Sequence, residues 1–191
     1  MYIGTLIGTV GEPSIRRRAA EISLGQGSID KTGIKKAQED MEGIIFVGLQ
    51  ASGKSSFFLE KFYETHIRLN MDMLKTRHRE KILLNACIEG KQKTVIDNTN
   101  PTTVERAKYI NLFKQGKFKV TGYYFQSRIE ECIKRNNQRS GPKAVPETAI
   151  RGTYNKMKIP DFDEGFDDLF YVSIENNQFN VNPWDNEIYQ S

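Results

Sequence analysis

The residues from Gly48 to Ser55 have the composition and spacing of a phosphate-binding loop. They read Gly48-Leu49-Gln50-Ala51-Ser52-Gly53-Lys54-Ser55, which matches the pattern GxxxxGK[ST] at every required position. Glycines let the backbone turn tightly, so that successive N–H groups point at phosphate oxygens. Lys54 adds a cation for the β- and γ-phosphates, and the Ser55 hydroxyl can ligate Mg²⁺. We therefore predict that these residues, together with Ser56, bind a nucleoside triphosphate such as ATP with Mg²⁺.

The sequence on either side of this motif has the context that the motif requires. An apolar run at 43–47 precedes it, as expected of a buried parallel strand, and a helical pattern follows at 54–63. The start of that helix would present its positive end to the same phosphates. The motif predicts a triphosphate site without fixing the reaction, because kinases, switches and motor ATPases share it.

Two carboxylates follow other strand-like segments. Asp72 comes after the segment 66–70, and Asp97 ends the segment 93–97. Asp72 is placed either to take a proton from an attacking hydroxyl or to cap the helix that follows it. Asp97 is placed either to hold Mg²⁺, as a Walker B aspartate does, or to organise the Asn-rich turn that it begins.

A basic segment near residue 135 is a candidate lid. It contains Arg135 and Arg139 and ends in Gly141 and Pro142, which is typical of a helix end followed by a hinge. Arginines on such a lid could close over the triphosphate and stabilise charge in the transition state. By composition alone, a solvated helix end remains the other interpretation.

Strand-like and helical patterns alternate along the chain from residue 43. This order predicts an α/β fold, with a mostly parallel sheet and helices on both faces. Ligands in such sheets bind at the carboxyl ends of the strands, where Asp72 and Asp97 are expected. The predicted strands are 43–47, 66–70, 93–97, 118–125 and 169–174, and the predicted helices are 54–63, 77–90, 99–114, 129–137 and 147–157.

Composition suggests one domain of ordinary size with uneven charge. Residues 41–159 contain 22 lysines and arginines against 11 acidic residues, whereas residues 160–191 contain 8 acidic residues and no basic ones. A basic body suits a polyanionic partner such as ATP or a nucleic acid. We assign residues 41–175 to the P-loop domain and residues 1–40 to an N-terminal extension without assigned role. Residues 176–191 are an acidic tail, interpreted as a solvated end in preference to a shielding or interaction segment.

Localisation is expected to be cytoplasmic. No apolar run approaches the length needed to span a bilayer, and no segment resembles a secretory signal, so we expect no membrane association. Cys87 and Cys132 stand apart without partner spacing, as reduced thiols do. The sequence gives no indication of oligomeric state.

Several short motifs, in this order, resemble the kinase domain of polynucleotide 5′-hydroxyl kinases. They are the phosphate loop, Asn70-Met71-Asp72, the IDNTNP segment at 96–101 and the KRNNQR segment at 134–139. The KAVP segment at 143–146, with Arg151, Tyr154 and Met157, is similar to the bacteriophage enzyme. The DNTNP turn and Glu164-Gly165-Phe166 are more similar to the animal enzymes. Zeta-toxin-like kinases share the broader pattern.

The resemblance implies a role for each matching residue. Asp72 would be the general base that activates a 5′-hydroxyl, and Asp97 would support the acceptor or metal site. Lys54 and Ser55 would hold ATP and its metal. Arg139, with Arg135 beside it, would contact the ATP phosphates from the lid.

Two departures leave the acceptor open. Met71 replaces the middle arginine of the family's Asn-Arg-Asp, and Lys75 stands where the phage enzyme has an arginine that contacts the acceptor's phosphate. Lysine keeps the charge but loses the bidentate fork. A 5′-hydroxyl polynucleotide is the expected acceptor. The alternatives are a kinase of a small metabolite or nucleotide sugar, and a regulatory ATPase that signals through nucleotide binding.

Overall fold

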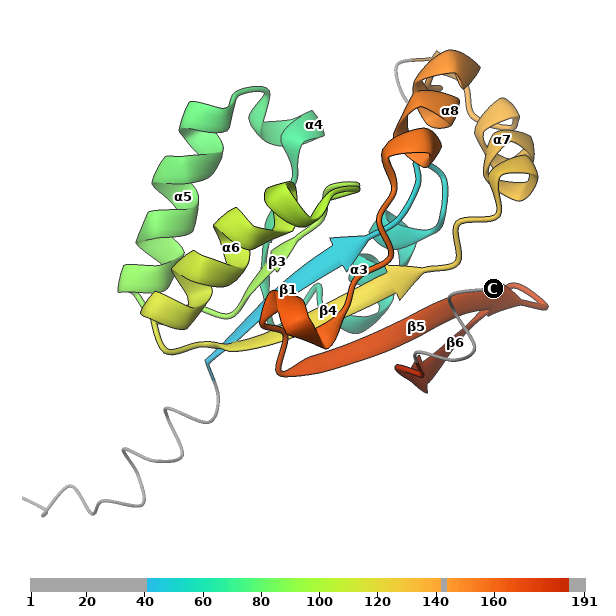
Figure 1. The fold of residues 1–191 in the computed structure, drawn as a ribbon. Coiled ribbons are helices and arrows are strands. Elements are labelled where there is room, and N and C mark those ends of the chain that lie inside the picture. Colours follow the sequence, from blue (N-terminus) through green and yellow to red (C-terminus); the bar gives the residue numbers. More distant parts are fainter. Residues whose placement is uncertain (1–40, 142–143, 186–191) are drawn as a thin grey trace, which may run out of the picture. The chain divides into compact units, whose positions relative to one another are not determined.

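The computed structural model describes residues 41–141 and 144–185. Within them, six strands form one sheet in the order β2-β3-β1-β4-β5-β6 (Figure 1). The strands are β1 (Glu42–Val47), β2 (Ile67–Leu69), β3 (Thr94–Ile96), β4 (Lys119–Phe125), β5 (Asp168–Glu175) and β6 (Gln178–Pro183). The helices are α3 (Lys54–Lys61), α4 (Met71–Leu74), α5 (Arg77–Glu89), α6 (Thr103–Gln115), α7 (Ile129–Asn137), α8 (Glu147–Lys156) and the short 3₁₀ helix η2 (Phe162–Glu164).

Five of the strands are parallel, which confirms the predicted mostly parallel sheet. The strand β1 pairs in parallel with β3 on one side and with β4 on the other. The strands β2 and β5 extend the parallel sheet beyond β3 and β4, and β6 pairs antiparallel with β5. The segments that follow β1, β2 and β3 therefore leave the sheet at the same edge. They carry the phosphate-binding loop, Asp72 and Asp97.

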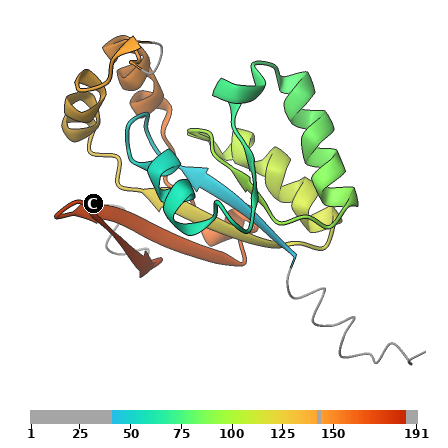
Figure 2. The same cartoon turned by 180° about the vertical axis from the view of Figure 1, so that it is seen from behind.

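Alternate residues of β1 pack against helices on opposite faces of the sheet. Ile45 and Val47 belong to the core cluster that contains Phe113 of α6. Ile44 and Phe46 belong to a second cluster, which contains Phe57 of α3. Figure 2 shows α3 on the opposite face of the sheet from α5 and α6. Because β1 is buried on both faces, it is apolar throughout instead of alternating.

All ten predicted elements are present; α7 has the predicted ends, and the other nine are shifted at one or both ends. The largest shift is in α6, which begins at Thr103 and not at Thr99. Residues 99–102 instead form a turn, in which Asn100 has a φ of 44° and Thr102 caps the helix. Two short elements were not predicted, α4 and η2. A four-residue helix is too short to give a periodic pattern.

Within the predicted solvated tail, Gln178–Pro183 form the strand β6, and five of its six residues are exposed. Glu175 and Gln178 are paired, so Asn176 and Asn177 alone connect the two strands. Both have positive φ, 51° and 59°, as a two-residue hairpin turn requires. The Asn-Asn pair between two strand-like runs is the sequence feature from which this hairpin could have been predicted. The acidic residues of the segment 160–191 had suggested a solvated end, but few of them lie in the hairpin itself.

The extension predicted for residues 1–40 lies outside the described residues, as do Pro142, Lys143 and residues 186–191. Among the described residues, none of the helices combines the length and the apolar composition that a membrane-spanning helix needs.

Candidate active site

The phosphate-binding loop connects β1 to α3 and is anchored at its start. The Gly48 N–H donates to the carbonyl oxygen of Thr99 at 3.0 Å, and the Leu49 N–H donates to the Ser127 hydroxyl at 3.1 Å. At its end, Gly53 has a φ of 100°. A Cβ atom there would lie 2.8 Å from Ile174 and 3.1 Å from Phe179. Glycine is therefore required for its backbone conformation and for the close approach of the β5–β6 hairpin.

Lys54 is buried within this loop. Its ammonium donates to the carbonyl oxygens of Gly48, at 2.9 Å, and Leu49, and to the Ser52 hydroxyl at 3.2 Å. Burial lowers the pKa of Lys54 to about 8, against an ordinary value of 10.5. Asp97 raises this pKa, Arg139 lowers it further and Asp72 raises it. Three other predicted site residues are thus close enough to Lys54 to act on its charge.

Ser55 and Asp97 form the pair predicted to hold Mg²⁺. The Ser55 hydroxyl donates to Asp97 Oδ2 at 3.1 Å, and Asp97 is only 2% exposed. A hydroxyl and a carboxylate are ligands suited to Mg²⁺, which usually takes one or two protein carboxylates and completes its shell with phosphates and water. Among residues 41–141 and 144–185, no three His, Cys, Asp or Glu side chains gather into a metal cage. An oxygen pair of this kind fits a metal whose remaining ligands are phosphates and water.

Arg68, which was not among the predicted site residues, completes this cluster. Its Nε donates to Asp97 Oδ2 at 2.8 Å, and its Nη2 contacts the same oxygen and donates to Ser55 Oγ at 2.8 Å. Arg68 of β2 pairs with Val95 of β3, and Val95 lies on the same face of its strand as Asp97. A charged residue inside a short strand was the available signal, but the pairing of β2 with β3 was needed to interpret it.

Asp72 is the second residue of α4 and caps no helix. Asn70 caps α4, because its Oδ1 accepts from the N–H groups of Asp72 (2.9 Å) and Met73 (3.3 Å). Thr76 caps the next helix, α5. The capping interpretation of Asp72 is therefore wrong. Its carboxylate is exposed and accepts no hydrogen bond from the residues that the structure describes.

Asparagines fix the position of α4 relative to the end of β3. Asn70 Nδ2 donates to the Asp97 carbonyl oxygen at 2.6 Å, and Asn98 Oδ1 accepts from the Met71 N–H at 3.0 Å. The turn after β3 is thus organised by asparagine side chains. The Asp97 carboxylate contacts Ser55 and Arg68 instead, so the alternative that Asp97 organises the turn is wrong.

A hydrogen-bond network around the buried Glu80 carboxylate holds the side chain of Asn98 in place. Asn98 Nδ2 donates to Glu80 Oε1 at 2.9 Å, and the Tyr109 hydroxyl donates to the same oxygen at 2.7 Å. Arg77 also donates to both Glu80 oxygens. Burial raises the pKa of Glu80, but the hydrogen bonds from Arg77 and Tyr109 lower it more, so that it lies below its ordinary value. Glu80 is therefore a buried carboxylate that holds the turn beside Asp72.

The predicted lid contacts the phosphate-binding loop through α7 and α8. Arg135 Nε donates to the Ala51 carbonyl oxygen at 2.9 Å. Arg139 follows the end of α7, is exposed, and influences Lys54 through its charge. Buried Asn136 bonds the N–H and the carbonyl oxygen of Val145, which ties the end of α7 to the start of α8. From the loop, Gln50 Nε2 donates to Thr153 Oγ1 of α8 at 2.9 Å.

The fold and this loop define a P-loop nucleotide-binding domain with a helical lid. A family model described as an AAA domain matches residues 44–159, and the chain belongs to this family. The resemblance to polynucleotide kinases is confirmed by two curated relatives. One is a bifunctional polynucleotide phosphatase/kinase of Schizosaccharomyces pombe, 30% identical over 73% of this chain and 35% of that protein. The other is a putative bifunctional polynucleotide phosphatase/kinase of Acanthamoeba polyphaga mimivirus, 33% identical over 70% of this chain and 33% of that protein.

A solved structure supports the same fold. A chain of the Pnkp1/Rnl/Hen1 RNA repair complex matches with a TM-score of 0.51 and 20% identity, over 60% of this chain and 43% of that chain. At this identity, the likeness establishes the fold alone. The chain spans about a third of the length of the curated relatives that it matches.

Proposed function

We propose that this protein transfers the γ-phosphoryl group of ATP to the 5′-hydroxyl of a polynucleotide. The observation that carries the proposal is the position of Lys54 in the phosphate-binding loop. Its ammonium is close enough to three charged side chains for each to shift its pKa: the carboxylates of Asp97 and Asp72 raise the pKa, and the guanidinium of Arg139 lowers it. The residues that we propose as general base, metal ligand and lid arginine therefore all lie near one phosphate-binding loop.

In the proposed reaction, Asp72 accepts the proton of the acceptor hydroxyl. The hydroxyl oxygen bonds to the γ-phosphorus as the bond from that phosphorus to the β–γ bridging oxygen breaks, and ADP leaves. The exposed Asp72 carboxylate has no protein partner among the described residues and is available to an acceptor. Its helix is held by Asn70 and Asn98, which gives the base a fixed place.

The phosphates would be held from two sides. The loop N–H groups and Lys54 would bind them on one side, and Arg135 and Arg139 of the lid would bind them on the other. Arginines so placed stabilise the charge that develops on the transferred group. Ser55 and Asp97 would hold Mg²⁺, which neutralises charge on the β- and γ-phosphate oxygens when bound.

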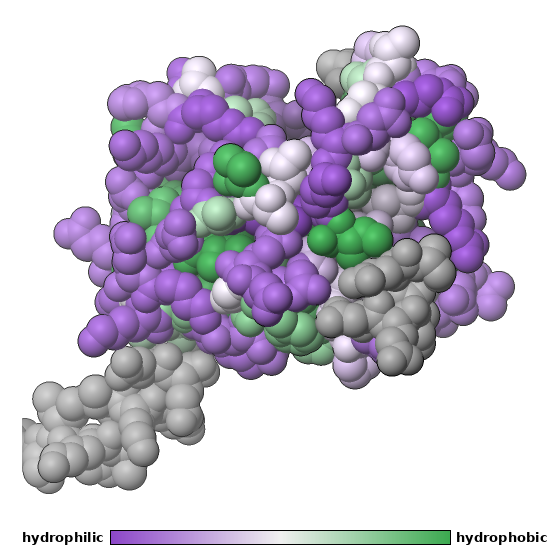
Figure 3. Space-filling model, viewed as in Figure 1, coloured by the Kyte–Doolittle hydropathy of each residue, from purple (hydrophilic) through white to green (hydrophobic). Residues whose placement is uncertain are grey.

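The charge of residues 41–159 suits a polynucleotide. Residues 41–159 carry twice as many basic as acidic side chains. Hydrophilic residues cover most of the face drawn in Figure 3, where apolar residues form separate small patches. Such a surface favours a polyanion over an apolar ligand. Cys87 and Cys132 are buried and free, which fits the reducing cytoplasm that we propose as its compartment.

The test is transfer of label from γ-labelled ATP with Mg²⁺ to a 5′-hydroxyl DNA or RNA oligonucleotide. A 5′-phosphorylated oligonucleotide and a reaction without acceptor are the controls. Label on the 5′-hydroxyl oligonucleotide alone is the expected result. Release of phosphate without an acceptor, unchanged by Asp72→Asn, would instead indicate a nucleotide-hydrolysing regulator.

A further inference from the structure

Arg68 contacts both residues that we propose as metal ligands. Its Nη2 donates to Ser55 Oγ at 2.8 Å and also contacts Asp97 Oδ2, and its Nε donates to the same carboxylate oxygen at 2.8 Å. The Phe58 ring lies against the guanidinium, with Arg68 Cζ 5.3 Å from the ring centroid. One nitrogen atom, Nη2, therefore touches both oxygens of the proposed metal site, which are only 3.1 Å apart.

A metal ion bound by these oxygens would compete with that nitrogen. Mg²⁺ takes its oxygen ligands at about 2.0–2.1 Å, and Nη2 lies 2.8 Å from Ser55 Oγ, so the metal and Nη2 on that oxygen could be no more than about 5 Å apart. Two cations at this separation repel each other, and more strongly where water is partly excluded. The guanidinium and the metal are therefore alternative partners of Ser55 Oγ.

The Arg68 side chain can release Ser55 without releasing Asp97. The bond to Ser55 uses Nη2 alone, whereas Asp97 is also held by Nε. The Arg68 side chain is 22% exposed, and Ser55 is exposed, so the end of the guanidinium can turn toward solvent. The buried Asp97 carboxylate then keeps a charged partner through Nε, which avoids the cost of leaving it unpaired.

A metal ion without a nucleotide would meet two cations at this site. Arg68 is one of them, and Lys54 is the other. Burial lowers the pKa of Lys54 and the nearby Asp97 carboxylate raises it, so the ammonium lies within electrostatic reach of that carboxylate. The phosphates of a bound nucleotide supply the negative charge that reverses this balance. Metal binding at Ser55 and Asp97 should therefore depend on the nucleotide.

We propose that Arg68 is a positioning residue, which holds Ser55 and Asp97 in place and yields Ser55 to Mg²⁺ only when the metal binds together with a nucleotide. The inference rests on the part of the proposed function that assigns Mg²⁺ to Ser55 and Asp97, and it is independent of the acceptor. Arg68 thus sets how much the metal contributes to nucleotide binding, and it keeps free metal ions from the site.

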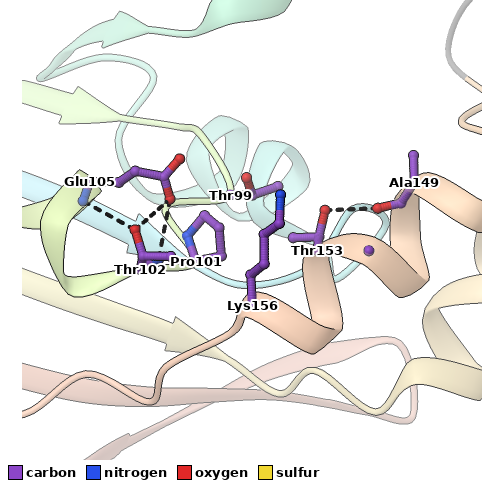
Figure 4. Close-up of a pocket in the computed structure, with 8 residues that line it drawn as sticks. Thr99, Pro101, Thr102, Glu105, Ala149, Thr153 and Lys156 are labelled. Carbon is purple, nitrogen blue, oxygen red and sulfur yellow. Dashed lines mark hydrogen bonds between the residues drawn. The ribbon is translucent and has the colours of Figure 1, made fainter.

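The cavity drawn in Figure 4 is separate from this cluster. It has a volume of about 550 Å³ and lies between the turn that follows β3 and the helix α8, and neither Arg68, Ser55 nor Asp97 lines it. A change at Arg68 therefore leaves the walls of that cavity as they are. Its effects on metal and nucleotide binding can be assigned to the cluster itself.

The experiment measures the dissociation constant of ADP by titration calorimetry, once with Mg²⁺ and once with a chelator. The ratio of the two constants is the gain in affinity that the metal brings. In Arg68→Gln the metal displaces no guanidinium, so we expect this gain to exceed the wild-type gain by about tenfold or more, the scale of one charged contact. A purely structural role would change both constants alike and leave the ratio unchanged.

Mg²⁺ without nucleotide gives a second measurement on the same proteins. It should raise the thermal unfolding temperature of Arg68→Gln, because the metal replaces the lost cation beside Asp97, and should change that of the wild type little. Arg79→Gln is the matched control, since Arg79 is an exposed arginine of α5 that donates to the Leu74 carbonyl oxygen. It should behave as the wild type does in both measurements.

A third measurement uses the wild type and so does not depend on the folding of a variant. The Nε–H signal of Arg68 in a nitrogen–proton correlation spectrum, assigned through its own backbone resonances, reports on the guanidinium. ADP with Mg²⁺ should shift this signal, and ADP with a chelator should leave it near its original position. Equal shifts in the two conditions would overturn the proposed release of Ser55.

Ser55→Ala separates failure of this inference from failure of the proposed metal site. If Ser55→Ala loses the gain that Mg²⁺ brings and Arg68→Gln keeps the wild-type gain, the role of Arg68 is overturned and the metal assignment stands. If Ser55→Ala keeps the full gain, both are overturned. Transfer of label to an oligonucleotide tests the acceptor independently of either result.

Discussion

Arg68 and Ser55 both hydrogen-bond to the same oxygen of Asp97, Oδ2. Arg68 lies in β2, Ser55 at the start of α3, and Asp97 directly after β3, so this contact joins three segments at the edge of the sheet. The Asp97 side chain is 1% exposed and that of Arg68 is 22% exposed. Arg68 therefore supplies the positive charge that makes burial of this carboxylate tolerable.

Replacing Arg68 by glutamine should destabilise the protein. The change leaves the Asp97 carboxylate buried without its cation, which costs on the order of 3 kcal/mol in the free energy of unfolding. Urea unfolding of the two proteins measures the difference. Lys119→Gln is the control, because Lys119 forms an exposed ion pair with Asp168 and should cost less than about 1 kcal/mol. Equal losses in both variants would contradict the structural importance of Arg68.

Replacing Asp72 by asparagine should slow transfer without weakening ATP binding. Asparagine keeps the size of the side chain but cannot accept the acceptor's proton, and a general base contributes roughly 10²–10⁴-fold to the rate. The measurement is kcat for label transfer, with ATP affinity determined separately. Asp163→Asn changes an exposed carboxylate of η2 and should leave both values as they are. A wild-type rate for Asp72→Asn would exclude Asp72 as the base.

Replacing Arg139 and replacing Arg135 should have different effects on kcat and on ATP binding. Arg139→Ala removes a charge near Lys54 and should lower kcat by roughly 10³-fold, the scale of a charge-stabilising arginine. Arg135→Ala also removes the hydrogen bond to the Ala51 carbonyl oxygen, so it should weaken ATP binding as well. Steady-state kinetics with varied ATP separates the two effects. Lys134→Ala, an exposed change on the same helix, should behave as the wild type does.

Glu80 should make the stability of the protein depend on acid pH. Its folded pKa lies below the ordinary value of 4.5, so the unfolded chain binds more protons than the folded protein as the pH falls below about 4.5. The stability that Glu80 contributes is therefore complete above that pH and is lost as the pH falls through its folded pKa. Glu80→Gln should cost about 2 kcal/mol at pH 7, because hydrogen bonds to a buried charge are lost.

The difference between wild type and Glu80→Gln isolates this group from other carboxylates. Urea unfolding at pH 7 and at about pH 3 should show the difference shrinking in acid. Glu89→Gln, an exposed change on the same helix, should show no such trend. A difference that stays constant with pH would mean that Glu80 acts only through its shape and not through its charge.

The amino-acid sequence alone determined the phosphate-binding loop and the class of fold. The spacing from Gly48 to Ser55 is local, and the strand and helix on either side of it are visible in periodicity. Because parallel strands end at the same edge of a sheet, the sequence also placed Asp72 and Asp97 near that loop. These inferences needed only short-range patterns and one general rule of topology.

Only the tertiary structure decided which side chains complete the site. Arg68 meets Asp97 because β2 pairs with β3 in one register, and Gln50 meets Thr153 across 103 residues of sequence. The sequence left open whether Asp72 caps a helix. In the structure Asn70 is the cap of α4, because its side chain accepts a hydrogen bond from the Asp72 N–H. No local pattern encodes such contacts, since they arise when strand pairing and core packing bring distant segments together.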